Sequence, residues 1–408
     1  MKKEKKSILE NRKANQRNKI LSVIRFGEEV SRNDLRNSTS YSMTTVLSVV
    51  EELLKEGLVY EEECEESRVG RKPIWLKINP QGGYFLGIEF NARCQHSVVL
   101  NFSGEKIYSK SGEMDRGDTP EQILDKIQNG IEEAKAFLGE KNKRLLGIGI
   151  GIPGYVDSEK GMARSYRHFE NWRDIPVREI LEERTGLPVY IENNVNVMAL
   201  AYKWLYFQDK REDFIFLSIR TGARMIPVIN NKLIYSKSGF SGEIGHIKIA
   251  SSHYMCSCGS FECLNSEISD YGISARIREG IAAGRFREIK EMVQGDLEQI
   301  TVGTFVASVQ KGHGDSLCLL ENIAKTLGMA LGMVINILAP GEIILFGELA
   351  ALGLVFTDLV KKYADQGVIP ENRGNYRIEI ARGGRDLGGI GAAALVMQQQ
   401  LNFVESLI

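Results

Sequence analysis

Three cysteines and a histidine are gathered in one stretch, residues 242–263, with the sequence GEIGHIKIASSHYMCSCGSFEC. Cys256, Cys258 and Cys263 lie within eight residues, and His246 precedes the first of them by ten. One imidazole and three thiolates form the tetrahedral ligand set of a structural zinc site, and a closed set of four leaves no position for a reacting water. The spacing therefore predicts a structural zinc site rather than a catalytic one.

Two other readings of this stretch stay open. The three cysteines could be free thiols in a loop, although Gly259 between the second and third favours the tight knuckle that a metal site needs. His253 competes with the upstream histidine as the fourth ligand, because spacing alone does not separate them. The remaining cysteines, Cys64, Cys94 and Cys318, are isolated in the sequence and are predicted to be inert.

This stretch also carries a resemblance to a known family. The run Gly-Glu-x-Gly-His, followed after ten residues by Cys-x-Cys-Gly and a third Cys, resembles the signature of the ROK family, which groups sugar-responsive repressors, sugar kinases and uncharacterised relatives. The resemblance extends over nearly the whole chain. It implies a two-lobed, ribonuclease H-like body of the actin-like ATPase and sugar kinase type.

Composition sets broad limits on the protein class. A chain of 408 residues is expected to hold two or three domains. Its 52 Lys and Arg balance 53 Asp and Glu, but the first 36 residues carry eleven basic against five acidic side chains, which indicates a basic N-terminal arm. The sequence shows no secretory signal and no apolar run expected to span a bilayer. We therefore expect a cytoplasmic protein without a membrane partner, in which clustered cysteines bind metal rather than form disulfides.

The first eighty residues predict a winged helix-turn-helix. Apolar residues at helical spacing mark helices over 15–26 and 43–56, with a short helix capped by Ser31 between them. Residues 58–62 and 73–78 then form a hairpin wing with a basic tip. A second helix, a polar turn and a recognition helix are the parts that enter a DNA groove. The predicted DNA contacts are Arg32, Ser42, Met43, Thr44, Thr45, Ser48, Arg68, Arg71 and Lys72. The alternative is a small helical domain that binds another protein, which the glutamates of the wing favour.

Beyond the linker, strands and helices alternate in the manner of an α/β body. We expect strands at 84–90, 95–101, 103–109 and 145–152 in a first lobe, and at 213–219, 342–347 and 377–381 in a second. Helices are expected at 120–138, 315–338 and 386–400. The predicted domains are 1–80, 81–200 and 201–408, and the C-terminal helix is a candidate to pack back on the first lobe.

The residues that distinguish the kinases of this family indicate whether this chain has kinase activity. Kinases of the family end their first strand in Asp-x-Gly-Gly-Thr, where this chain has Glu89-Phe90-Asn91-Ala92-Arg93, and their second phosphate loop reads Gly-Thr-Gly-x-Gly, where this chain has Arg220-Thr221-Gly222-Ala223-Arg224. A backbone that wraps phosphates needs those glycines. The family's catalytic Asp is Asn194 here, and a carboxamide lacks the basicity of a carboxylate. We therefore predict that the protein is not an enzyme.

The same comparison implies a sugar pocket. The predicted ligand-binding residues, which the resemblance and the hydrogen-bonding capacity of amide, carboxylate and imidazole groups suggest, are Gly154, Asn193, Asn194, Glu243, His246 and Asn265. Asn265 stands where the family carries a sugar-contacting Glu, so glucose is not assumed as the ligand. Asn193 and Asn194 are also good candidates to cap the helix that follows them.

These observations favour a repressor that binds double-stranded operator DNA as a homodimer or higher oligomer and responds to a carbohydrate or sugar phosphate. The alternatives are an ATP-dependent sugar kinase with an added DNA-binding domain, and a regulator controlled by a protein partner.

Overall fold

Strand β6 (Leu145–Ile152) shows how the first lobe is built, because its sequence, LLGIGIGI, alternates glycine with isoleucine. Alternate residues of a strand face opposite sides of the sheet. Ile148 and Ile150 are fully buried in the core that α4 covers. On the other side, a Cβ at Gly149 would lie 1.8 Å from the carbonyl oxygen of Ala392 in α13. Glycine is therefore required where α13 (Leu387–Leu401) crosses the sheet.

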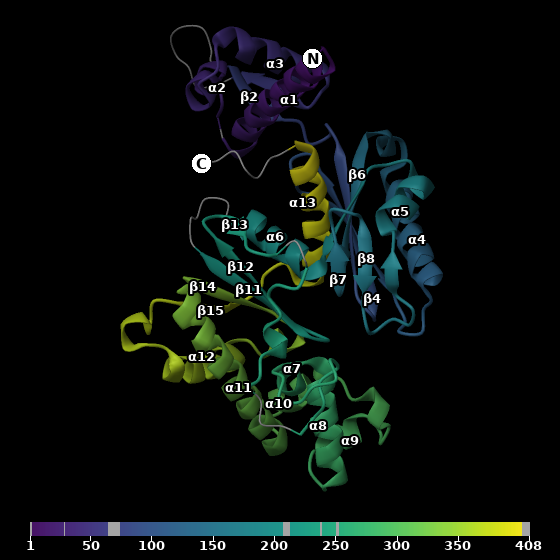
Figure 1. Ribbon diagram of the computed structural model, residues 1–408, viewed down its shortest axis with the longest axis vertical. Helices are drawn as coiled ribbons and strands as arrows, with labels where there is room; N and C mark the ends of the chain where they lie inside the picture. The colour runs from purple at the N-terminus through teal and green to yellow at the C-terminus, as the bar shows by residue number, and fades with distance from the viewer. Residues whose placement is uncertain are drawn as a thin grey trace. The chain divides into compact units, whose positions relative to one another are not determined.

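The computed structural model describes residues 2–27, 29–63, 74–206, 213–236, 239–249 and 253–401. Its fold divides into two compact units, one of Met1–Ala201 with Arg385–Ile408 and the other of Tyr202–Gly384 (Figure 1). The first unit therefore holds the N-terminal helices, the first lobe and α13, and the second unit is the second lobe. The predicted three-domain boundaries stay a prediction.

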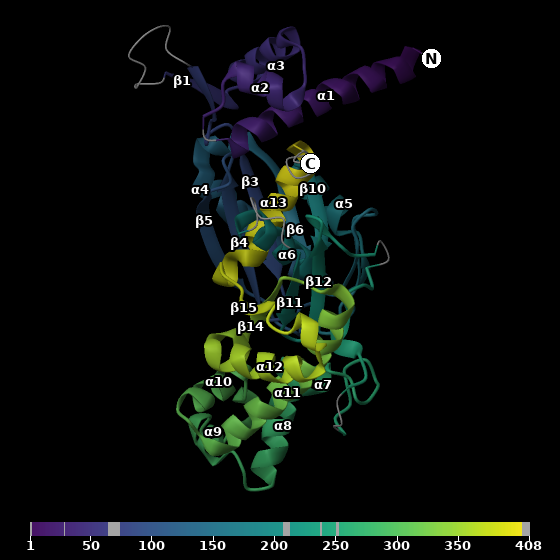
Figure 2. The same ribbon diagram turned by 90° about the vertical axis from the view of Figure 1, so that its left-hand side faces the viewer.

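The N-terminal part consists of three helices and a hairpin: α1 (Lys2–Phe26), α2 (Arg32–Thr39), α3 (Met43–Lys55), β1 (Val59–Glu63) and β2 (Ile74–Ile78). Ser31 caps α2 through a capping box with Asp34, as the sequence predicts. Ile20, Leu21 and Ile24 of α1 are buried, so the C-terminal half of α1 packs with α2 and α3 (Figure 2). Helix α1 begins well before residue 15, the start expected from apolar spacing.

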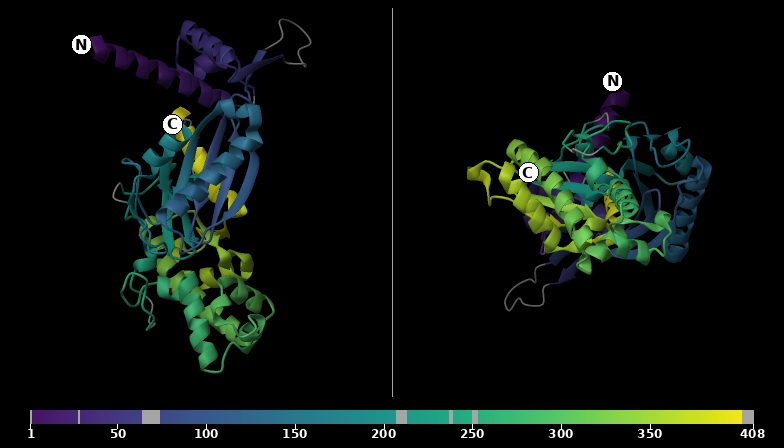
Figure 3. Two further views of the ribbon diagram at one scale, coloured as in Figure 1. Left: turned by 90° about the vertical axis from the view of Figure 1, so that its right-hand side faces the viewer. Right: turned by 90° about the horizontal axis from the view of Figure 1, so that it is seen from below.

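The first lobe contains a five-stranded sheet in the order β10-β6-β3-β4-β5. Strands β3, β4 and β5 are antiparallel, whereas β3, β6 and β10 are parallel. Helix α4 packs on one face and α13 on the other, as the views of Figures 2 and 3 show. The bounds not yet given are β3 (Tyr84–Phe90), β4 (Cys94–Asn101), β5 (Lys106–Glu113), β10 (Val189–Asn193), α4 (Pro120–Leu138), α5 (Val177–Thr185) and α6 (Asn194–Tyr206), with a small sheet of β7 (Tyr155–Asp157), β8 (Met162–Ser165) and β9 (Arg173–Ile175).

One predicted strand is displaced. The third strand was expected at 103–109, but β5 runs from Lys106 to Glu113. The reason is a tight turn over 101–105, in which the backbone N–H groups of Gly104 and Glu105 donate to the backbone and side-chain oxygens of Asn101. Such an Asx turn uses the residues that alternation alone would assign to a strand.

The second lobe repeats the sheet order of the first. Its strands lie in the order β13-β12-β11-β14-β15, again with three antiparallel strands followed by two parallel ones. The bounds are β11 (Phe214–Ile219), β12 (Ala223–Ile229), β13 (Lys232–Leu233), β14 (Glu342–Gly347), β15 (Arg377–Ile380), α7 (Asn265–Ile268), α8 (Asp270–Ala282), α9 (Arg287–Met292), α10 (Val302–Gln310), α11 (Gly314–Leu338) and α12 (Leu354–Gly367). The two sheets thus share one topology.

Helix α11 is unusually long and apolar. It has 25 residues, and among the described residues it is the one helix long and apolar enough to cross a membrane, whereas no such run was expected. Within the second lobe it is a core helix, with 61% of its apolar window buried. Gly328 allows it to approach α12, because a Cβ there would lie 2.7 Å from the carbonyl oxygen of Val360.

Candidate functional site

The second lobe brings the four predicted metal ligands together. One ligand atom from each of His246, Cys256, Cys258 and Cys263 lies within 4.8 Å of the others. The sulfur atoms of Cys258 and Cys263 are 3.7 Å apart, and His246 Nδ1 is 3.7 Å from the sulfur of Cys256. Tetrahedral bonds of about 2.3 Å place two zinc-bound sulfurs roughly 3.8 Å apart. The residues present therefore fit a tetrahedral metal ion.

The electrostatic environment differs between two thiols of the cluster. Burial and the two neighbouring thiols raise the pKa of Cys263 to about 11, although Lys248 acts in the opposite direction. Burial also opposes the ionisation of Cys256, but hydrogen bonds from the Cys258 backbone and from Tyr271 outweigh it and lower the pKa of that thiol. Without a metal the Cys263 thiolate is therefore disfavoured, whereas a bound metal deprotonates its thiol ligands.

Local structure explains why these ligands meet. Gly259 takes a positive φ of 84°, which confirms the predicted knuckle between the second and third cysteine. His253 is not part of the cluster, because it is largely exposed and its Nε2 lies 3.3 Å from Glu279. Tyr271 and Lys248, which sequence reasoning missed, each donate to a cysteine sulfur, at 3.2 and 3.3 Å.

Glu243 connects the cluster to the predicted ligand site. His246 turns Nδ1 toward the cysteines and Nε2 toward Glu243, with 3.9 Å between Nε2 and Glu243 Oε2. Arg224 lies 3.7 Å from the other carboxylate oxygen. Burial raises the pKa of Glu243, and Arg224 partly offsets that effect. The carboxylate is thus held between a cation and the outer nitrogen of a predicted metal ligand, which orients it as a hydroxyl acceptor.

Asn265 lies in the interior of the second lobe. Its side chain is 3% exposed, and its amide oxygen accepts a 2.8 Å hydrogen bond from the backbone of Ala223. A Cβ at Gly245 would lie 2.0 Å from that oxygen, so glycine is required beside it. The carboxamide therefore supports the loop between β11 and β12, and its role as a ligand contact stays a prediction.

In the first lobe, Asn193 has a clear structural task. Its side-chain oxygen accepts from the backbone of Val195 at 2.9 Å, which caps α6 as the sequence predicts. Its amide nitrogen donates to the carbonyl oxygen of Gly154 at 2.8 Å. Gly154 has a φ of 80°, and a Cβ there would lie 2.2 Å from the carbonyl oxygen of Ser165. The predicted ligand residues Asn193 and Gly154 are therefore adjacent.

Asn194 has a partner that sequence reasoning missed. Its amide nitrogen donates to Oε1 of Glu89 at 3.0 Å, and both side chains are buried, with exposures of 5% and 1%. Glu89 is the last residue but one of β3, 105 residues away, so no local pattern joins the two. A neutral donor beside a buried carboxylate satisfies both groups.

The resemblance relates two loops to phosphate binding. In both of them, side chains of the loop itself contact nearby groups of the protein. In the first, the oxygen of Asn91 accepts from the backbones of Arg93 and Cys94 at 2.8 and 3.2 Å. In the second, Arg220 lies over the ring of Phe346, and Arg224 donates to the carbonyl oxygen of Gly239 and pairs with Glu243.

The N-terminal part presents the start of α3 to solvent. Ser42 caps the helix by accepting from the backbone of Thr45. Ser42, Thr44 and Ser48 are exposed, as is Leu47, a large apolar side chain that sequence reasoning did not include. Among the other predicted contacts, Met43 and Thr45 are half-buried, and Arg32 pairs with Glu61 of β1. Arg68, Arg71 and Lys72 lie outside the described residues.

Arg25 joins the N-terminal helices to the first lobe. It lies near the end of α1 and donates to the carbonyl oxygen of Ser103, at 3.1 Å, and to the sulfur of Met397 in α13 at 3.9 Å. Burial lowers its pKa to about 9, so the guanidinium remains charged at neutral pH. From the linker side, Arg144 donates to the carbonyl oxygen of Gln81 at 2.7 Å.

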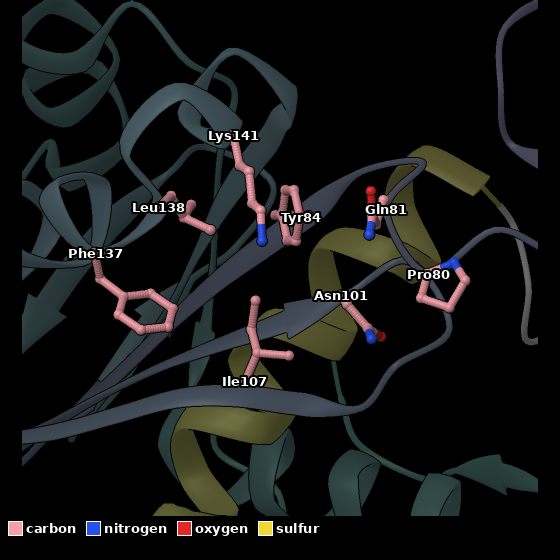
Figure 4. Close-up of a pocket in the computed structure, with 8 residues that line it drawn as sticks. All are labelled: Pro80, Gln81, Tyr84, Asn101, Ile107, Phe137, Leu138 and Lys141. Atoms are coloured by element: carbon pink, nitrogen blue, oxygen red, sulfur yellow. The ribbon is translucent and has the colours of Figure 1, made fainter.

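A cavity of about 320 Å³ opens beside this linker (Figure 4). Apolar and polar side chains share its wall, and its lining residues are Pro80, Gln81, Tyr84, Asn101, Ile107, Phe137, Leu138 and Lys141. The predicted ligand residues do not line this cavity, so the predicted sugar pocket and this hollow are separate features.

Comparison with known proteins gives a consistent result. A family model described as the ROK family matches residues 86–399. The chain is 28% identical over 386 residues to a protein named xylose repressor from Caldicellulosiruptor bescii, a match that covers 95% of this chain and 96% of that relative.

Two solved structures confirm the predicted fold class. One is a ROK family transcriptional regulator described as a homolog of the E. coli MLC protein, with a TM-score of 0.82, 22% identity and coverage of 96% of this chain and 97% of that one. The other is a ROK family glucokinase from Streptomyces griseus in complex with glucose and AMPPNP, with a TM-score of 0.68 and 23% identity. This match covers 78% of this chain and 100% of the glucokinase chain.

Proposed function

Because the chain belongs to the ROK family, we propose that it is a DNA-binding transcriptional repressor whose sugar-kinase-like body binds a carbohydrate or sugar phosphate. The observation that carries this proposal is the combination of two parts in one chain. The family match begins at residue 86, and the residues before it fold into three helices and a hairpin. The regulator structure matches this chain almost end to end, whereas the glucokinase covers 78% of it.

The DNA contacts in this proposal come from the start of α3. Small hydroxyl side chains at Ser42, Thr44 and Ser48 are exposed and suit phosphate oxygens or base edges, while Leu47 suits a thymine methyl group. Arg32 and the basic wing tip complete the predicted interface. We expect a homodimer, because two such modules read two half-sites about 34 Å apart.

The effector contacts in this proposal are the predicted ligand residues of each lobe. Glu243 and His246 supply an acceptor and an oriented imidazole, and Asn193 and Asn194 supply amides. The body is proposed to lack kinase activity, because Asn194 donates to Glu89 instead of presenting a free carboxylate. Binding of the effector would then change the spacing of the two DNA-binding parts of the dimer.

A structural zinc ion is proposed for the cluster of His246 and the three cysteines. Four N and S ligands at these separations favour zinc over magnesium or calcium, which take oxygen ligands. When bound, the ion would fix the loop that carries Glu243 and would not act on a substrate. Such a site is stable in the reducing cytoplasm, where we expect the protein to work.

The test is fluorescence anisotropy of the purified protein on a labelled duplex from upstream of its own gene. Xylose and other pentoses enter a panel of sugars, amino sugars and their phosphates first, since one relative is named a xylose repressor. We expect binding that one compound weakens, and a Thr44→Ala, Ser48→Ala variant should bind the duplex several-fold more weakly. A Cys318→Ser variant, altered at an exposed residue of the second lobe, is the matched control.

Specific binding that no compound changes would contradict the effector part of the proposal and direct attention to a protein partner. The kinase alternative rests on the glucokinase match and is tested by coupled ADP release with the same sugar panel. Sustained turnover with any sugar would overturn the proposal that the body has no activity.

A further inference from the structure

Cys94 opens strand β4 next to a histidine on the same face of the strand. Residues two apart on a strand point to the same side, and His96 Nε2 lies 3.4 Å from the sulfur of Cys94. His96 is 6% exposed, whereas Cys94 is partly accessible to solvent. Its isolation from other cysteines in the sequence predicts an inert residue, but a thiol is activated by a neighbouring base and not by another thiol.

The histidine is itself held by a third residue. His96 and Ser111 are directly opposite each other in the antiparallel pairing of β4 and β5, and His96 Nδ1 lies 2.9 Å from Ser111 Oγ. When Nδ1–H donates to this hydroxyl, the lone pair of Nε2 faces the thiol. A nucleophile, a base and a group that orients the base are thus connected across two strands.

A further donor reaches the sulfur from the turn before β4. The amide nitrogen of Asn91 lies 3.4 Å from Cys94 Sγ, so two donors can stabilise a thiolate. The charged groups around the pair are mixed. Arg93 precedes the cysteine, Glu113 of β5 is opposite it in register, and the carboxylate of Asp386 is close enough to interact with His96.

We propose that Cys94 and His96 form a thiolate–imidazolium pair, which makes Cys94 a nucleophilic site modified by hydroperoxides and by soft carbon electrophiles. In this pair the thiol proton already resides on His96 Nε2 when hydrogen peroxide arrives. The sulfur then attacks one peroxide oxygen, so that an S–O bond forms and the O–O bond breaks. The departing hydroxide takes the proton from His96 and leaves as water. The thiol is oxidised to a sulfenic acid, and the peroxide is reduced.

The first test is the rate at which iodoacetamide modifies each cysteine of the full-length, metal-loaded protein, followed by peptide mass spectrometry from pH 6.5 to 8.5. An ordinary thiol with a pKa of about 8.5 is about one per cent ionised at pH 6.5, so its rate rises roughly fiftyfold over this range. The paired thiol should change less than about threefold. The rate at each cysteine is compared with the rate at the same cysteine at another pH, which removes differences in accessibility. Exposed Cys318 is the internal reference.

Variants then separate the pair from its surroundings. His96→Asn should give Cys94 the pH profile of an ordinary thiol. Ser111→Ala should shift the profile in the same direction by less, because it removes only the orienting hydroxyl. In the wild type, stoichiometric peroxide followed by a dimedone probe should label Cys94 before Cys318.

If the modification rate of wild-type Cys94 depended on pH as that of Cys318 does, the proposal would be overturned. This outcome needs no variant, so it does not depend on whether a variant folds. A flat wild-type profile that survives His96→Asn in a folded protein would equally overturn the role of His96. Dimedone labelling of Cys318 ahead of Cys94 would refute the hydroperoxide part.

Discussion

The two lobes share one sheet order but satisfy their buried polar groups in different ways. In the first lobe, the amide of Asn194 donates to Glu89 and that of Asn193 donates to Gly154, so each group has a partner within the chain. In the second lobe, thiols lie 3.7 Å apart, and the pKa of one is raised to about 11. These buried amides of the first lobe are therefore satisfied within the chain, whereas the thiol cluster of the second lobe fits an added cation.

The largest expected effect is at the metal cluster. Cys258→Ser should release the metal and destabilise the second lobe by roughly 3–5 kcal/mol, because a hydroxyl is a poor ligand where a thiolate is needed. Metal content by atomic emission and thermal unfolding measure this, with Cys318→Ser as the control outside the cluster. If Cys258→Ser had the metal content and the melting temperature of the wild type, the second lobe would not depend on a bound metal, and the two lobes would not differ in this respect.

The next prediction tests whether buried polar side chains of the first lobe are satisfied by partners within that lobe. Asn194→Asp would place a second carboxylate about 3 Å from Glu89 and should lower the free energy of unfolding by roughly 3 kcal/mol. Adding Glu89→Gln restores a donor and acceptor pair, so the double variant should recover most of that loss. Denaturant unfolding of both single variants and the double variant gives the coupling energy. Additive effects would show that the two side chains do not interact.

A third prediction concerns a buried histidine of the first lobe. Burial, together with Arg116 and Arg93, lowers the pKa of His168 in the first lobe to about 4 from 6.5. Below pH 6.5 the unfolded chain binds this proton more readily than the folded one, so stability is lost as the pH falls from about 6.5 to 4. The loss is on the order of 2–3 kcal/mol.

His168→Asn should flatten this part of the stability profile relative to the wild type, as measured by denaturant unfolding at each pH. Equal slopes in the two proteins would contradict the assignment.

The smallest effect separates the two roles of Asn193. Serine is also a good helix cap, so Asn193→Ser should keep the α6 cap and lose only the bond to Gly154, at a cost of roughly 1–2 kcal/mol, while Asn193→Ala loses both. If Asn193 also contacts the effector, both variants should weaken the response of DNA binding to that effector. A normal response in Asn193→Ser would limit this residue to its structural task.

Much of this molecule was predictable because it depends on local chemistry. The capping box of Ser31, the Asn193 cap and the knuckle at Gly259 involve residues within a few positions, and each was expected from residue type. The strand at 106–113 was misplaced because the side chain of Asn101 competes with the sheet for backbone donors. Local competition of this kind is visible in a sequence only when the Asx turn is considered.

The sequence by itself determined the metal ligand types, the alternating faces of β6 and the absence of a carboxylate at residue 194. Only the tertiary structure decided that His246 and not His253 joins the cysteines, that Glu89 meets Asn194 from 105 residues away, and that Ser111 stands opposite His96. Spacing constrains neighbours along the chain. Strand register and sheet order determine which distant side chains meet, and these follow from packing of the whole lobe.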